Sequence, residues 1–208
     1  MAQQVRREEE TMKKVVKFGG SSLASAGQFK KVGDIIHADC ARRYVVPSAP
    51  GKRFPADTKV TDMLYDCYRA AVTGKDFSQK LKNIKDRYQE IIDGLSLTLS
   101  LDSEFDKIEE QFRAGAGEDY AASRGEYLNG IVMAAYLGCT YIDAAEVIFF
   151  DENGNFLAEK TDQVLSERLE KEERAVIPGF YGSKPDGSVK TFSRGGSDIT
   201  GSIVAKAV

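Results

Sequence analysis

The sequence predicts an α/β fold in which a mainly parallel central sheet has helices on both of its faces. Short apolar runs that end at glycine or proline alternate with stretches of helical periodicity. The first three elements follow the order strand, helix, strand, which favours a crossover unit with parallel strands. Residues 62–114 have a helical pattern, and we expect them to form a helical subdomain inserted into the sheet-bearing domain.

The first crossover unit lies close to the start of the chain. Residues 15–18 form a short apolar run that ends at Gly19-Gly20, as expected for a buried strand that enters a tight turn. Apolar residues then recur at helical spacing over 29–36. Residues 44–46 form a second apolar run, which is closed by a proline and predicts the second strand.

The rest of the chain divides into helices first and short strands later. Residues 77–95 and 101–112 carry an apolar side chain at every third or fourth position, which is typical of amphipathic helices. A helix over 127–135 is expected to stop at Gly138. The remaining elements are strands at 141–142 and 147–150, a charged helix around 164–169, strands at 175–177 and 189–192, and a helix of small residues after Asp198.

The composition excludes several classes of function. The net charge of −3, with 29% charged residues of both signs, gives no reason to expect a nucleic-acid partner. No apolar run is long enough to span a membrane, and residues 1–13 are interpreted as a disordered extension. Cys40, Cys67 and Cys139 are odd in number and far apart, which argues against disulfides and a zinc site. We therefore expect a cytoplasmic protein with reduced thiols.

The first stretch that carries chemistry surrounds Lys17. This lysine lies at the end of a predicted strand, and Gly19, Gly20 and Ser21 follow it. Glycine lets the backbone approach a ligand closely, so that amide groups can point at phosphate oxygens, and the lysine adds a positive charge. The pattern differs from a P-loop. On spacing alone, a tight glycine turn beside a surface lysine explains it equally well.

The second stretch covers residues 193–201. Ser197 and Asp198 lie where a helix is expected to begin, which simple N-capping can explain. Capping does not explain why Arg194 precedes two glycines. An arginine can grip a carboxylate with a two-pronged hydrogen bond, and the glycines and the helix start would complete an anion pocket.

The third stretch is a carboxylate close to the predicted helix at 127–135. Glu126 is expected to open this otherwise apolar helix, where the helix dipole favours a negative charge. The functional alternative is that Glu126 pairs with the ammonium group of a substrate. From the residues alone, the dipole interpretation is favoured.

These stretches, in this order, resemble the aspartokinases of the amino acid kinase superfamily. The run at 17–22 is shared in looser form across that superfamily, whereas the run at 193–198 is the most specific. The resemblance covers residues 14–208 and implies an αβα sandwich of the amino acid kinase fold. Four further stretches support it, at residues 45–51, 59–62, 125–128 and 178–182.

The resemblance implies an activity and its participants. Aspartokinases use ATP and Mg²⁺ to phosphorylate the side-chain carboxylate of L-aspartate to 4-phospho-L-aspartate, the first step of lysine, threonine and methionine biosynthesis. It implies catalytic roles for Lys17 and Asp198, and phosphate contacts for Lys17 and the amides around Gly19, Gly20 and Ser21. It assigns no metal ligand within this sequence.

The resemblance also implies the aspartate pocket. Arg194 would hold the α-carboxylate of aspartate, and Glu126 would pair with its α-ammonium group. The other pocket residues are Ser48 and Thr61 near the β-carboxylate, Phe180 in the pocket wall, and Ser197 and Asp198. Asp198 would also orient Lys17 or the substrate amine. An extended loop separates Ser48 from Thr61 in the sequence.

The resemblance has a limited extent. Aspartokinases continue with a nucleotide-binding part and regulatory ACT domains, which we expect to be absent from residues 14–208. We therefore expect this polypeptide to make no acyl phosphate by itself and to self-associate, for example as a homodimer. Two alternatives remain: a kinase for another small acid of the superfamily, which the run at 193–198 disfavours, and a non-catalytic amino-acid-binding fragment.

Overall fold

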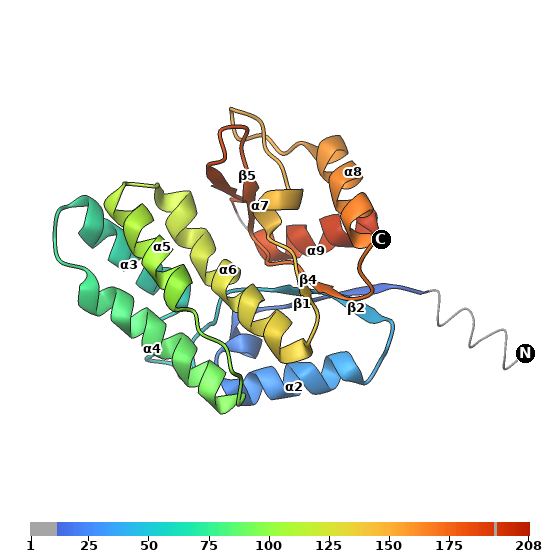
Figure 1. Ribbon diagram of the computed structural model, residues 1–208, viewed down its shortest axis with the longest axis horizontal. Helices are drawn as coiled ribbons and strands as arrows, with labels where there is room; N and C mark the ends of the chain where they lie inside the picture. Colours follow the sequence, from blue (N-terminus) through green and yellow to red (C-terminus); the bar gives the residue numbers. More distant parts are fainter. Residues whose placement is uncertain (1–11, 194) are drawn as a thin grey trace, which may run out of the picture.

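The computed structural model describes residues 12–193 and 195–208. Its centre is a four-stranded sheet in the order β1-β2-β4-β3, in which every neighbouring pair of strands is parallel (Figure 1). The predicted α/β class with a mainly parallel sheet is therefore confirmed. The strands are β1 (Lys14–Phe18), β2 (Arg42–Pro47), β3 (Thr140–Tyr141) and β4 (Ala175–Val176).

The connections between these strands contain the helices. An antiparallel pair, β5 (Tyr181–Ser183) and β6 (Val189–Thr191), follows β4 and precedes the last helix. In chain order, the helices are the 3-10 helix η1 (Gly20–Leu23), α2 (Ala26–His37), α3 (Val60–Val72), α4 (Ser78–Gly94), α5 (Asp102–Arg113), α6 (Glu118–Leu137), α7 (Ala144–Val147), α8 (Ala158–Leu169) and α9 (Gly196–Ala207).

The two faces of the sheet belong to two separate hydrophobic cores. Side chains alternate along β2, so Val45 joins the core of α2 and α3–α6, whereas Tyr44 and Val46 join the core of α7, α8 and α9. On β4, Val176 and Ala175 alternate in the same way. Figure 1 shows α2 on one side of the sheet and α8 and α9 on the other. The expectation of helices on both faces is confirmed.

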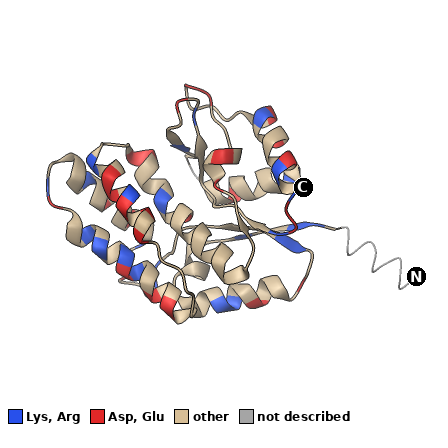
Figure 2. Ribbon diagram, in the orientation of Figure 1, with Lys and Arg blue, Asp and Glu red and all other residues tan. Residues whose placement is uncertain are grey.

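Helices α3, α4 and α5 pack against α6 beyond the edge of the sheet. Phe112 lies at the centre of this contact, and its ring centroid is 5.5 Å from that of Tyr68 and 6.3 Å from that of Phe77. Helices α4 and α5 confirm the two amphipathic helices predicted from periodicity. Charged residues of both signs are spread over these helices and do not form one basic face (Figure 2). None of the helices in the described ranges has the length and apolar character needed to cross a membrane.

One predicted strand is wrong. Residues 147–150 were expected to form a strand, but Val147 ends helix α7, and residues 149 and 150 make only isolated bridges. The helix forms because Asp143 caps it, accepting a hydrogen bond from the Ala145 amide at 3.0 Å. A local side-chain cap therefore prevails over an apolar run with β propensity.

Candidate functional site

The loops that follow β1 and β2 lie backbone against backbone at the carboxyl end of the sheet. The Gly51 amide donates to the Gly20 carbonyl at 2.8 Å, and the Ser48 amide donates to the Phe18 carbonyl at 3.0 Å. A Cβ atom on Gly20 would lie 2.7 Å from the Ala49 carbonyl oxygen, which is closer than real Cβ contacts. The glycine turn after β1 is therefore required by the close approach of the second loop.

Lys17 and Asp198 form an ion pair at this edge of the sheet. Lys17 Nζ lies 3.0 Å from Asp198 Oδ1, and the two side chains are 26% and 72% exposed. Asp198 belongs to the first turn of α9, which begins after Gly195 in a left-handed conformation and has no side-chain cap. The fold thus brings together the two residues that the sequence analysis named as catalytic, from opposite ends of the chain. At this exposure the pair contributes little to stability.

Glu126 is a buried carboxylate without a full set of partners. The Ala49 amide hydrogen bonds to it, but its Oε2 atom has no partner among the described residues. Burial raises the pKa of Glu126 to about 7, against the opposing effects of the Ala49 amide and the charges of Arg124 and Lys17. Because a buried acceptor left without a donor costs free energy, this oxygen is suited to a cationic donor from a ligand.

The position of Glu126 in its helix corrects the dipole interpretation. Helix α6 begins at Glu118, so Glu126 lies two turns inside it and does not open the helix. Glu118 and Asp119 occupy the first turn, where the helix dipole favours negative charge. A carboxylate in the middle of a buried helix has no dipole benefit of this size, so the helix dipole does not explain Glu126.

The raised pKa of Glu126 predicts a pH dependence of stability. Its folded-state pKa of about 7 lies above the ordinary value of 4.5, so the folded chain binds the proton more tightly. The free energy of unfolding should therefore fall as the pH rises from about 4.5 to about 7, by roughly 3 kcal/mol from this group. Urea denaturation of the parent and of Glu126→Gln at several pH values measures the difference. The same pH dependence of the unfolding free energy in both proteins would contradict a raised pKa at Glu126.

Helix α6 presses Glu126 and Asn129 against the loop after β2. Asn129 Nδ2 donates to the Ser48 carbonyl at 2.6 Å, and Asn129 Oδ1 is buried without a partner in the described part of the chain. A Cβ atom on Gly125 would lie 2.7 Å from the Ala49 Cβ atom. Sequence reasoning missed Asn129, although its place three residues after Glu126 puts both side chains on one helix face.

Arg124 is a second residue of α6 that the sequence analysis did not assign. Its guanidinium donates to Ser123 Oγ at 3.1 and 3.0 Å and lies 4.3 Å from the centroid of the Tyr127 ring. A planar cation on an aromatic face is stabilised there even when it is buried. The signal in the sequence was an arginine within an otherwise apolar helical stretch.

The Phe180 segment packs on the first turn of α9. Phe180 has a φ of 84°, a left-handed conformation that is rare for a bulky residue, and its amide donates to Thr200 Oγ1 at 3.0 Å. A Cβ atom on Gly179 would lie 2.6 Å from Ser197 Oγ. These contacts hold Phe180, assigned to the pocket wall, against the helix that carries Ser197 and Asp198.

Three other predicted site residues have different outcomes. Thr61 is the second residue of α3, and the amide of Val60 before it donates to the Pro50 carbonyl at 3.1 Å. This bond places Thr61 close to the loop that carries Ser48. Ser21 is exposed at the glycine turn. Arg194 lies outside the described residues.

The described residues form no cage for a metal ion. Within residues 12–193 and 195–208, no three His, Cys, Asp or Glu side chains come together in a way that could hold one. The three cysteines are free thiols.

Comparison with known proteins places the chain in a family. The sequence model of the amino acid kinase family matches residues 12–208. The chain belongs to the amino acid kinase family. Aspartokinase 3 of Bacillus subtilis is 37% identical over a match that covers 94% of this amino acid kinase chain and 46% of that protein. Aspartokinase 1 of Arabidopsis thaliana, a chloroplastic protein, is 29% identical, with coverage of 93% and 38%.

Solved structures agree with this family. The crystal structure of Clostridium acetobutylicum aspartate kinase has a TM-score of 0.89 and 51% identity, covering 93% of this amino acid kinase chain and 45% of that chain. The Escherichia coli aspartokinase III structure with aspartate and ADP has a TM-score of 0.78 at 23% identity and supports the fold alone. The chain spans less than half of the length of the relatives it matches.

Proposed function

We propose that this chain is the aspartate-binding part of an aspartate kinase, which transfers a phosphoryl group from ATP to the side-chain carboxylate of L-aspartate. The observation that carries the proposal is the buried Glu126 carboxylate, whose Oε2 lacks a partner in the described residues while Lys17 is close enough to lower its pKa. A buried carboxylate oxygen that lacks a donor fits the ammonium group of an α-amino acid. The identity of 51% to an aspartate kinase supports the same substrate.

The proposed reaction needs little from the side chains. A β-carboxylate oxygen of aspartate attacks the γ-phosphorus of ATP, the bond from that phosphorus to the β–γ bridging oxygen breaks, and ADP leaves. The nucleophile is already ionised at neutral pH, so no general base is required. Catalysis then consists of aligning two anions and reducing their repulsion. Mg²⁺ is the usual companion of ATP in such reactions, but we assign it no ligand in this chain.

The residues at the carboxyl edge of the sheet divide between the two substrates. Lys17, oriented by Asp198, would neutralise charge on the transferred phosphoryl group, and the Gly19–Ser21 turn would approach its oxygens with backbone amides. Glu126 would accept hydrogen bonds from the α-ammonium group of aspartate. For the rest of the pocket we propose Ser48 and Thr61 near the β-carboxylate, Arg194 at the α-carboxylate, and Phe180 and Ser197 in the wall.

Calorimetry with L-aspartate over a range of pH tests the proposal. The ammonium group pairs with ionised Glu126. Aspartate affinity should therefore rise by up to about tenfold per pH unit as the pH approaches 7, and it should level off above pH 7. Binding near pH 7 should also release protons, which buffers of different ionisation enthalpy detect. Glu126→Gln should remove this pH dependence. Absence of aspartate binding at pH 8 would overturn the proposed function.

Parallel titrations with ATP and with other small acids separate the alternatives. Binding of aspartate without binding of ATP would favour the non-catalytic amino-acid-binding fragment. Tighter binding of another small acid, such as glutamate or acetylglutamate, would favour a different kinase of the superfamily. The cytoplasmic location and self-association as a homodimer remain predictions, and sedimentation velocity at several protein concentrations tests the second.

A further inference from the structure

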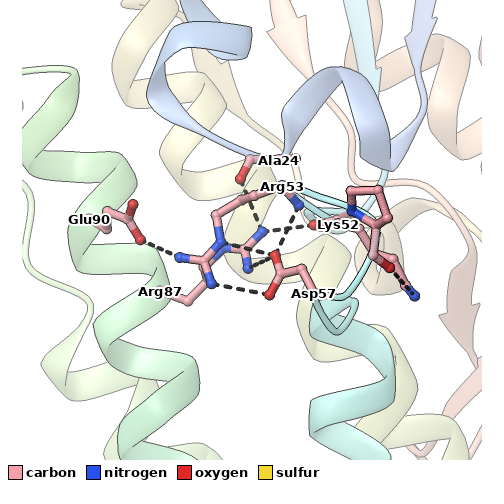
Figure 3. A network of polar contacts seen from close by, with 8 residues as sticks. Ala24, Lys52, Arg53, Asp57, Arg87 and Glu90 are labelled. Carbon is pink, nitrogen blue, oxygen red and sulfur yellow. Dashed lines mark hydrogen bonds and ion pairs between the residues drawn. The ribbon is translucent and has the colours of Figure 1, made fainter.

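A buried arginine on α4 contacts three loops at once. Arg87 is 4% exposed and lies on the apolar face of its helix. Its Nη2 atom donates to the Ala24 carbonyl at 3.0 Å and to the Gly51 carbonyl at 2.8 Å, and its Nη1 atom donates to Asp57 Oδ2 at 2.7 Å. Figure 3 shows the guanidinium of Arg87 between the segments that carry these oxygens.

Each of these three oxygens belongs to a segment of the candidate site. Ala24 directly follows η1, the glycine turn after Lys17. Gly51 closes the loop that begins at Ser48, and its amide is already bonded to the glycine turn. Asp57 lies in the segment that leads into α3 and Thr61. One side chain of the helical region therefore joins all three backbone segments.

Arginine has the shape that this position requires. Its planar guanidinium offers donors in a fixed fork, so one group can satisfy two carbonyls and a carboxylate in different directions. A lysine at this position would carry the charge on a single atom and could not hold the three segments in one geometry.

The opposite side of Asp57 is occupied by Arg53, which serves as a natural control. Arg53 bonds to Asp57 through its amide and side chain and to Glu90 at 2.7 Å, but it is a third exposed. Hydrogen bonds from Arg53 and then Arg87 hold the pKa of Asp57 well below its usual range. Arg53 shares the Asp57 carboxylate with Arg87, but its side-chain hydrogen bonds in the described structure go to Asp57 and Glu90 and not to the Ala24 or Gly51 carbonyl.

We propose that Arg87 is a positioning residue for aspartate binding, which acts by holding the Ser48–Gly51 loop so that the Ala49 amide meets the Glu126 carboxylate. The proposal rests on the function proposed above. It gives the helical region a part in substrate recognition, because the loop is fixed from both sides. Asn129 of α6 holds its beginning and Arg87 of α4 holds its end.

The test uses the 208-residue chain with Arg87→Met, Arg87→Lys and the control Arg53→Met. Two quantities are measured: the dissociation constant of aspartate at pH 8, and the titration of the Glu126 carboxyl by carbon-13 NMR without ligand, assigned with Glu126→Gln. Arg87→Met should weaken aspartate binding about tenfold. Its Glu126 titration should move to higher pH by about one unit, because a withdrawn amide no longer favours the ionised form.

The control keeps the charged and titratable groups of the described residues that interact with Glu126. These groups are Arg124 on α6, Lys17 on β1, Tyr88 on α4 and Tyr65 on α3. Arg53→Met should therefore leave the titration of Glu126 unchanged and aspartate affinity within about twofold. A folded Arg87→Met that retains both parental values would overturn the proposal.

Two further outcomes are decisive. If Arg87→Met does not fold, Arg87→Lys takes its place in the test. Weaker aspartate binding by Arg87→Lys than by Arg53→Met supports the proposal, and equal binding by the two variants rejects it. If neither Arg87 variant folds, Arg87 serves stability alone and the proposal is rejected. A parent chain that binds no aspartate, but whose Glu126 titration still shifts in Arg87→Met, would refute the proposed function while supporting the role of Arg87 in holding the Ser48–Gly51 loop against Glu126.

Discussion

Replacing Lys17 by methionine is expected to reduce turnover by a factor on the order of 10²–10³ in an enzyme that carries the whole kinase domain. Methionine keeps most of the length of the side chain at the end of β1 but removes the charge that lies 3.0 Å from Asp198. Aspartate affinity should change little, because the lost charge acts on the phosphoryl group. Trapping the acyl phosphate with hydroxylamine measures the rate.

Lys14 provides a matched control for this experiment. It lies on the same strand and forms an ion pair with Asp39 at 2.8 Å, away from the carboxyl end of the sheet. Lys14→Met should leave the rate of acyl phosphate formation unchanged. Turnover of Lys17→Met within a factor of a few of the parent would remove Lys17 from the mechanism.

The second large effect concerns the choice between aspartate and succinate. Succinate lacks the amine of aspartate, so it cannot use the unpartnered Oε2 of Glu126. Glu126→Gln leaves the substrate ammonium without an anion in a desolvated pocket, which should cost about 2–5 kcal/mol of aspartate binding. Aspartate affinity should fall by more than about tenfold. Succinate affinity should change less, so the ratio of aspartate affinity to succinate affinity should fall. Dissociation constants for both ligands in the parent and the variant measure this change.

Two companion variants sharpen that comparison. Glu118→Gln removes an exposed carboxylate from the first turn of the same helix and should leave the preference for aspartate unchanged. Arg194→Ala should weaken both ligands, because both carry the carboxylate that Arg194 is predicted to hold. If Glu126→Gln keeps the parental ratio of aspartate to succinate binding, Glu126 does not hold the amine.

Features that depend on neighbours in the sequence were predictable here. The apolar run at 15–18 and its glycine turn gave the first strand, and Gly138 ends α6 in the left-handed conformation expected of a C-terminal glycine. The helices over 77–95 and 101–112 followed from periodicity alone. Local steric and amphipathic rules are sufficient for such elements.

Features that depend on distant parts of the chain were not predictable in the same way. The start of α6 was placed too late, because its first turns are rich in small and charged residues and give little periodic signal. Asn129 and Arg87 bond to backbone carbonyls far away in the sequence, which no spacing rule can reveal. The roles of Lys17 and Asp198 came from the resemblance, and only the fold shows that they meet.

The strand order β1-β2-β4-β3 has a consequence for how this polypeptide is made. The ribosome delivers β1 and β2 early, but the strand that pairs with the other edge of β2 emerges only after α8, and the Tyr44 hydroxyl then donates to the Leu169 carbonyl, 125 residues further along. Until that moment the growing chain exposes an open strand edge, which is a template for aggregation. Closing so long a loop also costs conformational entropy before the native contacts that offset this cost have formed. Newly made chains should therefore depend on chaperones until residue 176 has left the exit tunnel.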